Sequence, residues 1–75
     1  MTVLLLSPTR VIYEGKAASV ILPGEKGVFE VLAYHKRLLS RLLGGRVIID
    51  QQSFPIKRGV AKVGISQMTI IVEEP

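Results

Sequence analysis

The sequence predicts an all-β fold, a small flattened β-sandwich or barrel of about eight to ten short strands. The first observation is a series of short apolar runs, rich in valine and isoleucine, that recur about every 8 to 12 residues or closer. The second is that turn residues close these runs, as at Ser7-Pro8, Gly15 and Gly64. The third is a hydrophobic content of 48% with modest net charge, which excludes a disordered chain.

The apolar runs define the expected strands in chain order. They are Thr2–Leu6, Val11–Glu14, Ala17–Leu22, Val28–Leu32, Val47–Ile49, Phe54–Lys57, Val60–Val63 and Gln67–Val72. The third run leads into Pro23-Gly24, which suits a type II turn because glycine accepts positive φ. We expect Gly24 or Gly27 to adopt positive φ there. Pro55 is expected on an edge strand, because proline cannot donate to a β-ladder.

The segment from His35 to Leu43 fits two kinds of structure. Leu38, Leu39, Leu42 and Leu43 have helical spacing, and Gly44 could cap the end of a helix. From the residues alone, a short amphipathic helix and a strand remain equally compatible with this segment. A nine-residue helix is marginal in water unless other elements pack against it.

The core of the sandwich follows from the same runs. We expect the following side chains in the interior: Val20, Leu22, Phe29, Val31, Ile48 and Ile70. We expect the 75 residues to form a single domain, residues 1–75. A domain of this size buries only about 60% of the surface of its unfolded chain. With a mean hydropathy of +0.40, the chain has more apolar surface than such a core can hide, which predicts a protein partner.

Charge is concentrated in one basic stretch. The net charge is +4, and Lys36, Arg37, Arg41 and Arg46 have no acidic residue among them. An interface with an acidic protein explains both these cations and the leucines between them. A solvated face and a nucleic-acid footprint are the two alternatives, and the presence of only four aromatic residues disfavours stacking on bases.

Residues suited to catalysis or to metal binding are scarce. The chain contains one histidine, one aspartate and no cysteine, and no serine has a nucleophile-elbow sequence around it. Glu14 and Glu30 lie next to turns, where solvated acids are ordinary. We therefore expect no catalytic, cofactor-binding or metal-binding residue. The run Val3–Leu6 is too short for a signal peptide, and no run approaches the roughly 20 apolar residues of a membrane span.

A resemblance extends over nearly the whole chain. It rests on Ser7-Pro8 followed by Tyr13-Glu14-Gly15, on the string from Leu22-Pro23-Gly24 to Gly27, and on His35 followed by Leu38-Leu39. In this order the sequence resembles the N-terminal β-sandwich of the epsilon subunit of F-type ATP synthase, the mitochondrial delta equivalent. Of the family's Pro-Gly-His-Ala-Pro turn this chain keeps only the histidine, and it ends at Pro75, without residues for the helical hairpin that usually follows.

The resemblance implies that the segment after His35 is extended, and that the protein is a non-catalytic central-stalk subunit. Such a subunit couples ion-driven rotation of the c-ring through gamma to ATP synthesis. It works on the cytoplasmic side of the bacterial inner membrane. The implied c-ring contacts are Gly27, Val28, Phe29, Glu30, His35, Lys36 and Arg37. The implied gamma contacts are Ser7 and Ser40. The alternative from the residues is a small basic β-barrel that binds nucleic acid.

Overall fold

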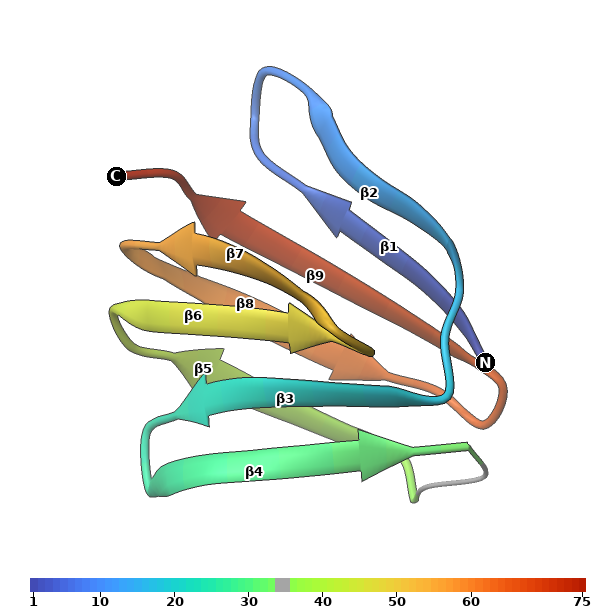
Figure 1. The fold of residues 1–75 in the computed structure, drawn as a ribbon. Helices are drawn as coiled ribbons and strands as arrows, with labels where there is room; N and C mark the ends of the chain where they lie inside the picture. The colour runs from blue at the N-terminus through green and yellow to red at the C-terminus, as the bar shows by residue number, and fades with distance from the viewer. Residues whose placement is uncertain (34–35) are drawn as a thin grey trace.

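The computed structural model describes residues 1–33 and 36–75, and this part of the chain contains nine β-strands and no helix (Figure 1). The strands are β1 (Thr2–Leu6), β2 (Val11–Lys16), β3 (Ser19–Gly24), β4 (Gly27–Leu32), β5 (Leu38–Leu42), β6 (Gly45–Ile49), β7 (Gln52–Ile56), β8 (Arg58–Val63) and β9 (Gln67–Glu73). The predicted all-β class and strand number are confirmed. The described residues contain no helix that could cross a membrane.

The strands form two layers that belong to one hydrogen-bonded path. Its order is β2-β1-β9-β8-β5-β3-β6-β7, with β4 beside β3. The path folds over between β5 and β3, where Gly24 stands opposite Leu42. The first layer is therefore β2-β1-β9-β8-β5 and the second layer is β4-β3-β6-β7 (Figure 1). Neighbouring strands are antiparallel, except that β1 and β9 run parallel.

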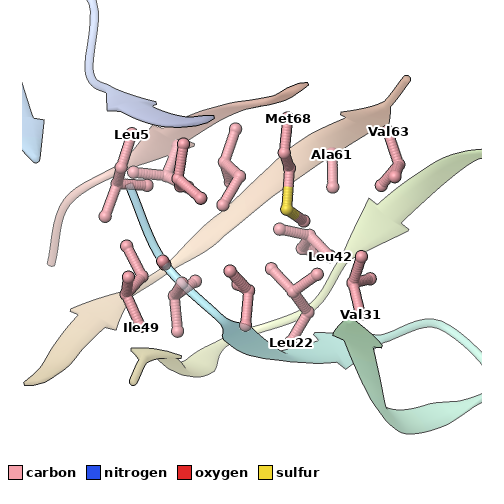
Figure 2. Close-up of a cluster of buried hydrophobic side chains, with 14 of the residues drawn as sticks. Leu5, Leu22, Val31, Leu42, Ile49, Ala61, Val63 and Met68 are labelled. Atoms are coloured by element: carbon pink, nitrogen blue, oxygen red, sulfur yellow. The ribbon is translucent and has the colours of Figure 1, made fainter. Parts of the chain in front are cut away.

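Apolar side chains from both layers fill the space between them (Figure 2). The buried residues are Val3, Leu5, Ala17, Val20, Leu22, Val31, Leu42, Val47, Ile49, Ile56, Ala61, Val63, Met68, Ile70 and Val72. Along β9, for example, Met68, Ile70 and Val72 are buried and the residues between them face outward. No polar or charged residue of the described part is buried.

Most of the expected interior residues are buried. These are Val20, Leu22, Val31 and Ile70. Phe29 is only partly buried and packs against the core from β4. The prediction for Ile48 was wrong, because Val47 and Ile49 point inward at 0% exposure and Ile48 lies on the outer face. Three consecutive apolar residues do not reveal which face of a strand is buried, and the pairing of Ile48 with Ile21 decides it.

The ambiguous leucine segment forms strand β5. The strand pairs along its whole length with β8, from Leu38 opposite Val63 to Leu42 opposite Gly59. The cross-strand ladder supplies the backbone hydrogen bonds that a short isolated helix could not maintain in water. The cost is that Leu39 faces away from the core and is 72% exposed.

The turn between β3 and β4 differs from the predicted one. Strand β3 continues through Pro23-Gly24, and the turn itself is formed by Glu25 and Lys26, so the placement of Pro23-Gly24 as the turn was wrong. Gly27 has a φ of 123°, which confirms the expected positive φ in this region. The other glycine is needed for packing, because a Cβ at Gly24 would lie 2.6 Å from a ring carbon of Phe29.

Asp50 makes the β6–β7 connection shorter than the sequence suggested. Its φ is 53°, in the left-handed region that aspartate tolerates better than most residues. One carboxylate oxygen of Asp50 accepts hydrogen bonds from the backbone N–H groups of Ala18 and Ser19, at 3.0 and 3.1 Å. The single aspartate thus ties this turn to the start of β3.

Candidate functional site

The described residues give no sign of a metal or acid–base site. Within residues 1–33 and 36–75, no three histidine or acidic side chains lie close enough to hold a metal ion. The acids make local structural contacts instead: Asp50 caps the β3 entry, and Glu30 accepts a 2.6 Å hydrogen bond from the Ser19 hydroxyl. The surface feature that stands out is exposed apolar area, which points to a protein interface.

A row of apolar side chains crosses the outer face of the first layer. Val11 pairs with Leu6, Leu6 with Ile71, and Ile71 with Val60. Residues directly opposite one another in a sheet share a face, so these four side chains form a continuous strip, called here the apolar row. Val11, Ile71 and Val60 are 53%, 52% and 42% exposed. Arg41, opposite Val60, ends the strip at β5.

The two expected gamma-contact residues do not belong to this row, and Ser40, opposite the buried Ala61, lies on the other face of β5. Ser7 directly follows Leu6, and Ser40 directly precedes Arg41. Both hydroxyls make local hydrogen bonds: the Ser7 oxygen accepts the backbone N–H of Arg10 at 3.2 Å, and Ser40 donates to the carbonyl of Arg41 at 3.0 Å. These serines therefore stabilise the backbone on either side of the row.

Sequence reasoning did not select the members of the apolar row. They occupy alternate positions in runs that look uniformly apolar, so a run such as Thr2–Leu6 gives no clue that Leu6 faces outward. The useful observation in the sequence was the excess of apolar residues for the size of the domain. That excess predicts an exposed patch but not its position.

Part of the expected c-ring set lies in a groove between the β3–β4 turn and β5, called here the hairpin groove. Its lining comprises Gly24, Glu25, Lys26, Gly27, Val28, Phe29, Leu38, Leu39, Ser40, Arg41 and Val60. The groove thus brings Gly27, Val28 and Phe29 together with Ser40, for which the resemblance implies a different partner. Val28 is 74% exposed at its edge.

The rest of the expected c-ring set lies elsewhere. Lys36 and Arg37 follow the far end of β4, whereas Gly27 begins that strand. A six-residue strand separates its ends by about 17 Å, so the two parts of the set do not form one patch. Glu30 lies between them on β4, and His35 lies outside the described residues.

The basic stretch is also divided by the fold. Arg41 lies on β5 in the first layer, where its guanidinium is 4.0 Å from the carboxylate of Glu25. Arg46 lies on β6 in the second layer and donates a 3.1 Å hydrogen bond to the hydroxyl of Ser53. The single basic patch suggested by the sequence is therefore wrong, because the chain crosses from one layer to the other between these two arginines.

Ion pairs hold the end of β9 in place. Arg58 donates a 2.6 Å hydrogen bond to Glu73, and this bond lowers the pKa of the Glu73 carboxyl below its ordinary 4.5. Arg10 donates a 2.6 Å hydrogen bond to Glu74 and lowers its pKa in the same way. The reciprocal effect raises the pKa of both arginines. Both acids follow closely after Ile71, so the pairs fix the backbone beside the apolar row.

Comparison with known proteins identifies the family of this chain. Residues 1–74 match the family described as "ATP synthase, Delta/Epsilon chain, beta-sandwich domain". The ATP synthase epsilon chain of Sulfurimonas denitrificans is 40% identical over 74 residues, which cover 92% of this chain and 57% of that one. The epsilon chain of Chlorobium limicola is 28% identical, with 93% and 85% covered. The chain spans little more than half the length of most of the relatives it matches.

A solved structure has the same fold. In the central stalk and c-ring of the Tetrahymena thermophila mitochondrial ATP synthase, one chain matches with a TM-score of 0.83. The match covers 97% of this chain and 63% of that one at 15% sequence identity, so it shows the fold alone. With the family match over 74 of 75 residues, the chain belongs to the ATP synthase delta/epsilon-chain β-sandwich family.

Proposed function

We propose that this chain is a non-catalytic rotor subunit in the central stalk of an F-type ATP synthase. In this role it links the ion-driven c-ring to gamma, at the cytoplasmic side of a bacterial inner membrane. Family membership supports the assignment, and so does the likeness in fold to a chain from the central stalk and c-ring of the Tetrahymena enzyme. The fold suits a coupling part, because its exposed apolar surface favours binding to a partner.

Gamma covers the apolar row in this proposal. The observation that carries it is the continuous strip of Leu6, Val11, Ile71 and Val60 on a solvent-facing sheet. Apolar side chains at the centre of an interface contribute most of its binding energy, and polar residues form its rim. Ser7 directly follows Leu6 and supplies part of such a rim, whereas Ser40 is opposite the buried Ala61 and lies on the other face of β5.

The c-ring meets the opposite edge in this proposal, through β4 and through Lys36 and Arg37. Gly27, Val28 and Phe29 line the hairpin groove, and Val28 is the most exposed of the large apolar residues in the described part. Glu30 adds a negative charge on β4, and Lys36 and Arg37 add positive charges after the end of that strand. Because these residues spread along the whole of β4, a ring of repeated loops could touch them at more than one place.

The test measures binding of the domain to purified gamma. Ile71→Asp places a charge in the apolar row and is expected to weaken gamma binding about tenfold or more, because a buried unpaired charge is costly. The matched control is Leu32→Asp on β4, since Leu32 and Ile71 are both 52% exposed and only Ile71 lies in the row. Equal binding by both variants would exclude the apolar row as the gamma contact.

A further inference from the structure

A second groove adjoins the hairpin groove, with which it shares Leu38 and Leu39, and it is called here the basic groove. Its lining comprises Arg37, Leu38, Leu39, Lys62, Val63, Gly64, Ile65, Gln67 and Thr69. Arg37 directly precedes β5, and the other residues come from the starts of β5 and β9, the end of β8 and the β8–β9 turn. The lining contains two cations and no acid, so an occupant would meet a positive surface.

The two cations of the basic groove have no acidic partner within the described part of the chain. The ion pairs of that part join Arg10 to Glu74, Arg41 to Glu25, and both Lys57 and Arg58 to Glu73. Lys62 lies between Leu39 on β5 and Thr69 on β9, and neither of these neighbours carries a carboxylate. Arg37 and Lys62 are therefore available to bind an anionic group from another molecule.

Exposed aliphatic side chains lie beside these charges. Leu39 is 72% exposed and Ile65 is 58% exposed, and both face the groove. Leucine and isoleucine have no favourable contact to offer a phosphate backbone, and the lining contains no aromatic side chain on which a base could stack. The mixture of cations and aliphatic groups matches a polypeptide segment that carries both carboxylates and aliphatic side chains.

We propose that the basic groove binds an acidic, aliphatic segment of a partner protein. The carboxylates pair with Arg37 and Lys62, and the aliphatic side chains cover Leu39 and Ile65. This goes beyond the proposed function, because the groove lies outside the apolar row and its occupant is defined by chemistry. Arg37 also belongs to the proposed c-ring contact, so the test is designed without c-ring or gamma.

The experiment uses fluorescence anisotropy with labelled synthetic peptides and the 75-residue chain. The first peptide mixes glutamate with leucine, the second contains glutamate with serine, and the third contains lysine with leucine. A single-stranded oligonucleotide is the fourth probe. We expect the glutamate–leucine peptide to bind best, with a salt dependence that reflects its two ion pairs.

Three variants locate the binding site. Lys62→Glu is expected to weaken binding of the glutamate–leucine peptide about tenfold or more, because it reverses a charge in the groove. Leu39→Ser is expected to weaken the same peptide and to leave the glutamate–serine peptide unchanged. Arg46→Glu is the matched control, because Arg46 is an exposed cation on the opposite layer, and it is expected to bind like the parent chain. Thermal unfolding checks that each variant folds.

Each other outcome overturns the proposal. Equal binding of the glutamate–serine and glutamate–leucine peptides would mean that charge alone attracts the probe. Tighter binding of the oligonucleotide would assign the groove to nucleic acid. Equal loss with Lys62→Glu and Arg46→Glu would mean a general effect of net charge. None of these results changes the expected binding of gamma to the apolar row, so the two proposals can fail separately.

Discussion

Asp50 shows how one residue can fix both a turn and the strand beside it. Its left-handed backbone suits aspartate and asparagine, and its carboxylate accepts two backbone hydrogen bonds from the start of β3. Asp50→Ala should therefore lower the free energy of unfolding by about 2 kcal/mol, through strain and lost hydrogen bonds. Asp50→Asn keeps an acceptor oxygen and the tolerated backbone, so it should lose less than half as much. Urea unfolding of the two variants measures the difference, and equal losses would contradict this role.

The carboxylates of Glu73 and Glu74 predict sensitivity to acid. Their pKa values are lowered in the folded protein by hydrogen bonds from Arg58 and Arg10. A carboxyl whose pKa is lowered by folding stabilises the fold fully at pH values above its ordinary pKa of 4.5. This stabilisation is lost as the pH falls through the pKa of the folded state. We expect the melting temperature to fall as the pH decreases below about 4.5.

A matched pair of proteins isolates this effect. The double variant Arg10→Gln and Arg58→Gln removes both guanidinium partners and should show a shallower decline of melting temperature with acid. The effect should be small and should shrink in salt, because the ion pairs are exposed to solvent. The same decline in parent and variant would show that other groups cause the acid sensitivity.

At the scale of single elements, β7 ends one edge of the sheet and carries Pro55. The expectation that Pro55 lies on an edge strand is confirmed. A proline offers no N–H to an incoming strand, so it blocks one position at which another chain could extend the sheet. Pro55→Thr should therefore increase self-association while leaving the fold intact. Sedimentation velocity measures it, with Ser53→Thr on the same strand as control, and an unchanged monomer fraction would contradict the blocking role.

The elements also show where sequence reasoning succeeds. Each predicted strand exists, because turn residues such as Ser7-Pro8 and Gly15 mark the limits of the apolar runs. The face that each strand buries is harder to predict when a run is uniformly apolar, as the wrong placement of Ile48 shows. Which side chains of a strand point into the core depends on the strand with which it pairs, and that pairing is a long-range property of the fold.

The candidate surfaces were predictable to a smaller extent. The excess of apolar residues in a small domain predicts an exposed apolar surface, and the apolar row is such a surface. Its members come from two hairpins, β1–β2 and β8–β9, that lie near opposite ends of the sequence, so no local pattern could assemble all of them. The same reason separates Arg37 from Arg46, which looked like one patch in the sequence and lie in different parts of the sandwich.

At the scale of the whole molecule, an aromatic pair joins the two layers. Tyr13 on β2 and Phe54 on β7 meet edge to face, with ring centroids 5.9 Å apart. A double-mutant cycle with Tyr13→Leu and Phe54→Leu should give a coupling energy of about 1 kcal/mol, because an edge-to-face contact is lost as soon as either ring is removed. Urea unfolding supplies the four free energies. Strictly additive losses would mean that the rings contribute only through separate burial.

The parallel pairing of β1 with β9 has a consequence for how the protein is made. β9 lies between β1 and β8, so the strand of this sandwich that the ribosome synthesises first is joined to its layer by the strand of the sandwich synthesised last. Until Met68, Ile70 and Val72 emerge from the ribosome, the inward side chains of β1, Val3 and Leu5, lack the neighbouring strand of their layer. The apolar side chains of the nascent β1–β2 hairpin therefore stay exposed to solvent while the intervening strands are made. A chaperone, or rapid pairing of β9 with β1 and β8, is needed to prevent aggregation.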